Sequence, residues 1–91
     1  MAPPNLFQEL KRKRKKIDLI DQKLLTLLNQ RLRHALEIGK IKQEVEEKVY
    51  DPRREREVLR RLKLKNKGPL KRKNVEELFK KIMKVCRKSQ I

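Results

Sequence analysis

Residues 17–41 read IDLIDQKLLTLLNQRLRHALEIGKI, and this stretch carries the strongest structural signal in the chain. Its apolar residues recur at three- and four-residue steps, which is the spacing of one face of an α-helix. The surrounding chain has no proline between Pro4 and Pro52 and only one glycine, Gly39. The sequence therefore predicts one long helix over about residues 5–46.

Such a helix is too long for a single small chain to enclose. About 40 helical residues span about 60 Å, whereas a compact chain of 91 residues has a radius of gyration of only about 12 Å. We therefore expect a homodimer in which two long helices pack against each other and share the shorter elements.

Composition places the chain in the all-α class. Its 91 residues suit one domain, 1–91, and they are 44% charged and 3% aromatic with only two glycines. This usage favours long charged helices over a sheet.

Two shorter helices follow, over about residues 52–64 and about residues 74–90. Asp51 stands directly before a proline, as an N-cap precedes a first-turn proline. The breaker KNKGP at 65–69 separates the two helices, and Asn74 begins a sequence that resembles a capping box. The inner face of the last helix is expected to carry Val75, Leu78, Phe79, Ile82, Met83 and Cys86.

The charge balance predicts an anionic partner. The formal net charge is +16, which suits nucleic acid, an acidic membrane surface or a small polyanionic substrate. The run KRKRKK at 11–16 would point its cations all round a helix, and few aromatics are present for base stacking. Nonspecific binding of nucleic acid at low salt is therefore an alternative function, whereas sequence-specific recognition is not supported.

Other classes are disfavoured by what the chain lacks. It has one cysteine and one histidine, which cannot form a Cys/His zinc site, so we expect no metal and no cofactor. No apolar run approaches the roughly 18 to 20 residues of a membrane span, and the N-terminus lacks the apolar core of a signal peptide. A cytoplasmic protein without a membrane partner is the expectation.

Three cations interrupt the apolar face of the long helix. Arg14, Arg31 and Lys42 fall on the two seven-residue rows that otherwise hold mostly apolar side chains. A buried cation without a counter-charge costs several kcal/mol. Each therefore needs an anion, either a ligand or a carboxylate such as Asp21 or Glu55, unless its side chain extends to solvent.

The spacing of these cations suits a small anionic ligand. Arg31 and Lys42 lie about 16 Å apart along a helix, so two long side chains that lean together can hold a small molecule. Arg14 lies about 25 Å from Arg31, and in an antiparallel dimer its copy from the second chain can reach the same ligand. Gln90, one turn after Cys86, offers either an uncharged hydrogen bond to a ligand or a solvated terminus.

Three motifs in this order resemble a known family. They are RKKIDLIDQKLLTLLNQR at 14–31, EIGKIK at 37–42 and YDPRRER at 50–56. Together they resemble the all-helical (AroQ-type) chorismate mutases over about residues 9–90. The tail from Gly68 most resembles the mutase domains fused to, or partnered with, the synthase that opens the shikimate pathway.

The resemblance implies conversion of chorismate to prephenate, a step toward phenylalanine and tyrosine, in an intertwined antiparallel homodimer with three helices per chain. This [3,3] rearrangement is intramolecular and requires no nucleophile, proton shuttle or metal. It requires a folded substrate conformer and stabilisation of the negative charge on the ether oxygen.

The resemblance also implies roles for particular residues. Arg31, and Arg14 from the second chain, would each bind a carboxylate of the substrate. Lys42 would contact a carboxylate and the ether oxygen, and Gln90 would be the second donor to that oxygen.

Further substrate contacts come from the second and third helices. Asp51, mainly through its backbone, and Glu55 would bind the ring hydroxyl, while Arg54 would add positive potential. Cys86 stands where the family often has a small hydroxyl or amide residue, and a thiol is a weaker donor. A further alternative is a regulatory domain that binds prephenate or chorismate and controls a partner synthase.

Overall fold

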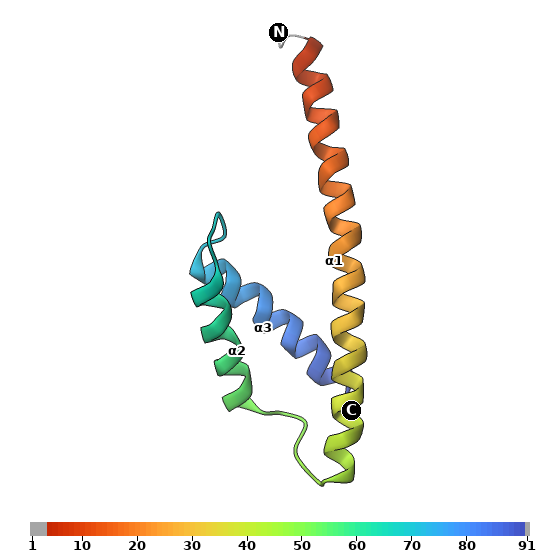
Figure 1. Cartoon of the computed structure of the whole chain (residues 1–91), viewed down its shortest axis with the longest axis vertical. Helices are drawn as coiled ribbons and strands as arrows, with labels where there is room; N and C mark the ends of the chain where they lie inside the picture. The colour runs from red at the N-terminus through yellow and green to blue at the C-terminus, as the bar shows by residue number, and fades with distance from the viewer. Residues whose placement is uncertain (1–3, 91) are drawn as a thin grey trace. The chain divides into compact units, whose positions relative to one another are not determined.

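The computed structural model describes residues 4–90 and contains three helices in that range. They are α1 (Pro4–Glu44), α2 (Pro52–Lys65) and α3 (Arg72–Ser89) (Figure 1). The predicted all-α class, with one very long helix and two shorter ones, is confirmed. Within the described residues, no helix is long and apolar enough to cross a membrane.

The chain divides into two compact units, Met1–Arg31 and Leu32–Ile91. In the first unit, every side chain from residue 5 to residue 30 is exposed. The exposed side chains include large apolar ones, for example Ile17 at 55%, Leu24 at 50% and Leu28 at 41%. This part of α1 therefore presents its apolar face without a covering element from its own unit.

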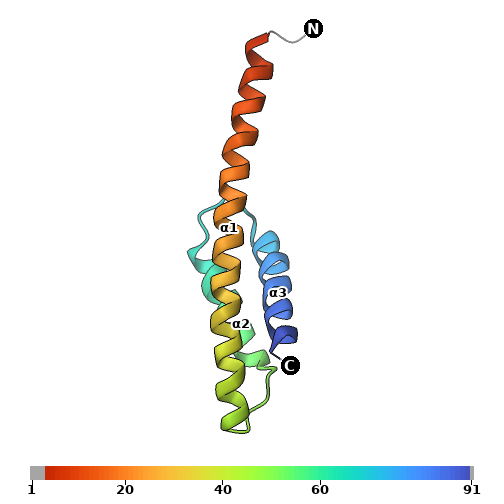
Figure 2. The ribbon, with the colours of Figure 1, turned by 90° about the vertical axis from the view of Figure 1, so that its right-hand side faces the viewer.

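The second unit contains the buried core. In it α2 and α3 pack against each other (Figures 1 and 2). The buried apolar side chains come from the end of α1, from α2 and from α3, and they are Ala35, Leu59, Val75, Met83 and Cys86. Burial follows the predicted inner face of α3 with one correction: Leu78 is 51% exposed, whereas Phe79 and Ile82 are half-buried.

Local side-chain contacts set the starts of α2 and α3. Asp51 is the N-cap of α2, as predicted, and its carboxylate accepts a hydrogen bond from the backbone N–H of Arg54 at 3.0 Å. α3 begins at Arg72, two residues before the predicted start. Asn74 is thus not the cap but a first-turn residue, whose side-chain oxygen accepts from the backbone N–H of Lys71 at 3.1 Å.

α1 ends about two residues earlier than predicted. The helix ends at Glu44, and the chain turns through Glu46, which has a positive φ of 58°. This left-handed conformation is unfavourable for a residue with a Cβ. The turn is closed by the backbone N–H of Glu47, which donates to the carbonyl of Lys42 at 2.8 Å.

Candidate active site

Lys42 lies in the last turn of α1 and points toward the chain that follows it. Its ammonium donates to the backbone carbonyl of Val49 at 3.0 Å, and the side chain is half-buried. One of its three N–H groups is used in this way, so the contact holds the ammonium in place and leaves two donors.

Gln90 at the end of α3 contacts the same helix. Its side-chain amide donates to the backbone carbonyl of Ala35 at 2.7 Å, and the residue is half-buried. Gln90 is therefore anchored and is not a solvated terminus. Ala35, Gly39 and Lys42 follow one another at helical spacing, so they lie on one face of α1. Gln90 contacts the face of α1 that carries Lys42.

Gly39 makes this approach of α3 to α1 close. A Cβ placed on Gly39 would lie 3.1 Å from both Cβ and Cγ of Gln90, which is tighter than ordinary contact. The sequence marks Gly39 as the only glycine of the long helix. A lone glycine inside a helix is a signal that could have marked a site of close packing, although the sequence predictions used this glycine only to support an uninterrupted helix.

Glu55 is held by a residue that sequence reasoning missed. The Arg87 guanidinium donates to the Glu55 carboxylate at 2.7 Å, and both side chains are about one quarter exposed, at 25% and 24%. The same guanidinium lies over the ring of Tyr50 with its carbon 4.3 Å from the ring centroid. No motif indicated Arg87, because the contact joins residues 32 positions apart.

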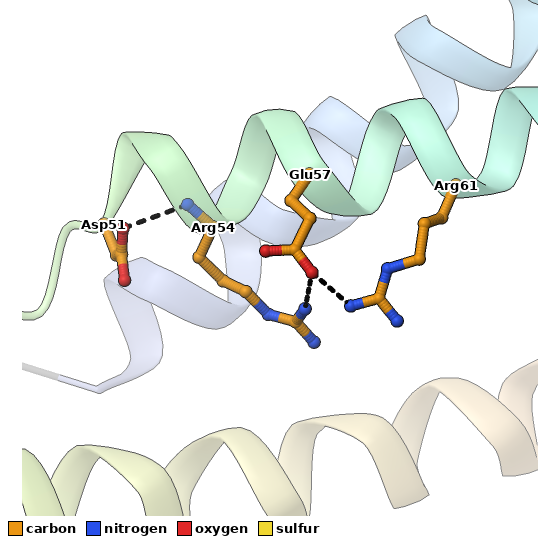
Figure 3. Close-up of polar contacts among 4 residues, drawn as sticks. All are labelled: Asp51, Arg54, Glu57 and Arg61. Carbon is orange, nitrogen blue, oxygen red and sulfur yellow. Dashed lines mark hydrogen bonds and ion pairs between the residues drawn. The ribbon is translucent and has the colours of Figure 1, made fainter.

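Arg54 takes part in a different, exposed network on α2. Figure 3 shows Arg54 and Arg61 converging on the carboxylate of Glu57, while Asp51 caps the helix beside them. The hydrogen bond from Arg61 and its charge hold the pKa of Glu57 below its ordinary value of 4.5. Arg54 thus extends along the surface of α2 toward Glu57.

The remaining predicted residues occupy three different environments. Cys86 is a buried thiol that forms no disulfide, one turn before Gln90. Arg31 is half-buried, and Arg14 is exposed; both belong to α1 within the first unit. The second unit by itself therefore places Gln90 against Ala35 and Gly39, on the turn of α1 before Lys42, and separately pairs Glu55 with Arg87.

This arrangement suits binding and charge stabilisation. The donors on the face of α1 are an ammonium and an amide, each fixed by a backbone carbonyl. Fixed donors of this kind stabilise negative charge on a ligand without having to reorganise.

Comparison with protein families agrees with the geometry. The family model for type II chorismate mutases matches residues 13–91. The bifunctional chorismate mutase/prephenate dehydratase of Neisseria gonorrhoeae is 47% identical over 73 residues, which are 80% of this chain and 20% of that protein. The Pseudomonas aeruginosa protein of the same description is 40% identical over 83 residues, or 86% of this chain and 23% of that protein.

Solved structures show the same likeness. The Thermus thermophilus chorismate mutase (form II) superposes with a TM-score of 0.89 at 34% identity, covering 90% of this chain and 93% of that one. The Helicobacter pylori chorismate mutase in complex with prephenate superposes with a TM-score of 0.85 at 36% identity, covering 91% and 90%.

One sequence prediction finds no support among these curated relatives. They join a mutase to prephenate dehydratase, so they give no support to the synthase-associated subgroup that the tail suggested. This chain spans only 20% and 23% of the lengths of those two relatives. The match over residues 13–91 nevertheless covers most of this chain, and on that evidence the chain belongs to the type II chorismate mutase family.

Proposed function

We propose that this chain catalyses the conversion of chorismate to prephenate. The observation that carries the proposal is the family match over residues 13–91. It is supported by the solved Helicobacter pylori relative, whose structure holds prephenate, and by the two anchored donors on one face of α1.

Lys42 and Gln90 are the proposed donors to the ether oxygen. That oxygen gains negative charge as its bond to the ring breaks, so donors already aimed at it lower the barrier. Gln90 gives one N–H to the carbonyl of Ala35, and its second N–H is left for the substrate. The contact with Ala35 therefore acts as a brace for the catalytic amide.

Arg31, and Arg14 from a second copy of the chain, are the proposed carboxylate ligands. A guanidinium fork matches a carboxylate with two parallel hydrogen bonds. Holding both carboxylates of the dianion fixes the folded conformer from which the rearrangement proceeds.

Residues of α2 and α3 complete the proposed site. Glu55 would accept a hydrogen bond from the ring hydroxyl. The Asp51 carboxylate is already used as a helix cap, so Asp51 would contribute through its backbone. Arg54 would supply positive potential, and Cys86 a weak thiol donor.

We also propose a homodimer, which the exposed apolar face of α1 supports. Large apolar side chains such as Ile17 and Leu24 are half-exposed along the first unit. A second copy of the helix is the element with the matching apolar pattern and length. An antiparallel arrangement of the two copies would also bring Arg14 of one chain to the site of the other.

The proposal is tested by following loss of chorismate and formation of prephenate with purified protein and no added metal. Arg31→Ala should abolish turnover, and Arg31→Lys should restore only part of it because an ammonium lacks the fork. Arg33→Ala is the matched control, since Arg33 is an exposed cation on the same helix. Absence of turnover by a folded dimer would contradict the proposal and favour a regulatory domain that binds the same ligands.

A further inference from the structure

An open groove runs between α2 and α3 in the second unit. It consists of two cavities of about 250 Å³ and about 280 Å³, and both are lined by Arg56 and Leu59. The two cavities share these two lining residues and follow one another along α2 and α3; we treat them together as one groove. The lining residues include seven lysines and arginines and two glutamates, so the groove is strongly cationic.

Both glutamates of the groove are already paired. Glu76 lies 3.4 Å from Lys63 and 3.2 Å from Lys80, and Glu55 is held by Arg87. The hydrogen bonds from Lys80 and Lys63 keep the pKa of Glu76 below its ordinary value. The side chains of four lining cations make no hydrogen bond or ion pair within residues 4–90, although the charge of Arg60 acts on nearby Glu57; these are Arg56, Arg60, Arg72 and Lys84.

The cations line both sides of the groove in rows. On α2, Arg56 and Arg60 are four residues apart and share a face. On α3, Arg72, Lys80 and Lys84 are spaced by multiples of four residues, and the row spans about 18 Å along the helix. Rows of this kind match a ligand with several negative charges in a line better than a single small anion.

We propose that this groove binds an extended, single-stranded phosphate polymer through its backbone. A linear chain that lies along the groove can contact the cations of both helices at once. Tyr50 is the aromatic residue of the lining, and its ring is covered by Arg87. The lining therefore offers no aromatic ring for base stacking, and we expect it to bind phosphates without sequence preference.

This site is distinct from the run of cations at residues 11–16. Those six side chains are exposed and belong to the first unit, and they are spread round α1. The groove instead concentrates its cations along two facing rows. Binding by the two regions can be separated by substitution, because they share no residue.

The test measures fluorescence anisotropy of a labelled oligothymidylate, on the order of 15 nucleotides long, across a series of salt concentrations. The groove variant is Arg60→Gln with Arg72→Gln and Lys84→Gln. The matched control is Arg33→Gln with Arg53→Gln and Lys81→Gln, which removes the same charge from exposed positions outside the groove lining. Circular dichroism verifies that each variant is folded.

The groove variant should bind at least about tenfold more weakly at low salt. Three lost phosphate contacts should lower the slope of log K against log salt by about 2, at about 0.7 for each contact on a single strand. The control should keep the wild-type slope. Equal losses in the two variants, or no measurable binding by the wild type at low salt, would overturn the proposal.

Two further experiments test whether the cations of residues 11–16 are responsible for binding, and whether phosphates alone, without bases, are enough. Replacing residues 11–13 and 15–16 by glutamine, with Arg14 kept, should leave the effect of the groove variant intact. If that change alone abolishes binding, the proposal is overturned. Linear polyphosphate should displace the oligonucleotide, whereas equal amounts of inorganic phosphate should not; failure of polyphosphate to compete would mean that bases are recognised and would contradict the proposal.

Discussion

Arg87 binds Glu55 from the far end of the second unit, with the guanidinium 2.7 Å from the carboxylate and stacked over Tyr50. This contact ties together the chain before α2, the first turn of α2 and the last turns of α3. Glu55 is thereby held in place beside the start of α2, where the proposed site needs it.

Arg87→Ala should therefore lower stability and substrate affinity together. The pair is only about one quarter exposed, so we expect a loss of about 1–3 kcal/mol in urea unfolding, including the cost of the unpaired carboxylate. KM should rise more than kcat falls, because Glu55 loses its orientation. Arg61→Ala, which breaks an exposed pair with Glu57, should cost clearly less, because solvent screens that pair. Equal costs would show that the Arg87–Glu55 pair stabilises the fold no more than an exposed ion pair does.

Gly39→Ala should separate stability from activity. Alanine favours a helix over glycine by about 1 kcal/mol, but its Cβ would lie 3.1 Å from two carbons of Gln90. The terminal Gln90 can move, so unfolding free energy should change little. The Gln90 amide would no longer point at the ether oxygen of the substrate, and kcat should fall by about tenfold or more. Unchanged kcat would contradict the proposed bracing of Gln90.

Gln90→Leu tests the donor itself. Loss of one donor to a developing oxyanion costs about 10²–10³ in kcat, and leucine also removes the bond to Ala35. Ser89→Leu is a neighbouring control, because Ser89 is exposed and its hydroxyl donates only to its own helix at Val85. Similar rates in the two variants would argue against Gln90 as a catalytic donor.

Glu46→Gly should stabilise the protein. Glu46 has a φ of 58°, and glycine adopts this conformation without the cost of a Cβ, which we put at about 0.5–1 kcal/mol net of glycine's greater freedom in the unfolded chain. Glu44→Gly removes the same charge from the last residue of α1, which has no positive φ, and should destabilise the protein by less than the cost of about 1 kcal/mol in a helix interior. Thermal or urea unfolding measures whether each substitution raises or lowers the free energy of unfolding.

Acidification should weaken the contact between α2 and α3. Hydrogen bonds from Lys80 and Lys63 lower the pKa of Glu76 in the folded protein. A depressed pKa means that the stabilisation is present above the unfolded value, 4.5, and is lost as pH falls through the lower folded value. The Tm difference between wild type and Glu76→Gln should therefore be larger at neutral pH than near pH 3; a difference independent of pH would show that Glu76 contributes through packing alone.

Much of the fold follows from local signals in the chain. The apolar period of residues 17–41 predicted the long helix, and the proline after Asp51 marked the start of α2, because both features act within one or two helical turns. The predicted start of α3 was two residues too late. Asn74 can accept a backbone hydrogen bond as the N-cap of a helix, or as a residue within the first turn of a helix that begins at Arg72. Local sequence does not choose between those two positions.

The candidate site divides in the same way. Lys42 could be selected because it interrupts the apolar face of the long helix, and Gln90 as one of two interpretations of the last residues. The residue pattern alone predicted the helical class, the cationic character and a small anionic ligand, whereas the dianion and the role of Glu55 came from the family resemblance. Only the folded chain shows that Gln90 is braced on Ala35 beside Gly39, and that Arg87 holds Glu55. Those contacts join residues 55 and 32 positions apart. Such pairings depend on how α3 packs against α2 and on where Gln90, at its end, meets α1, and no local periodicity encodes either.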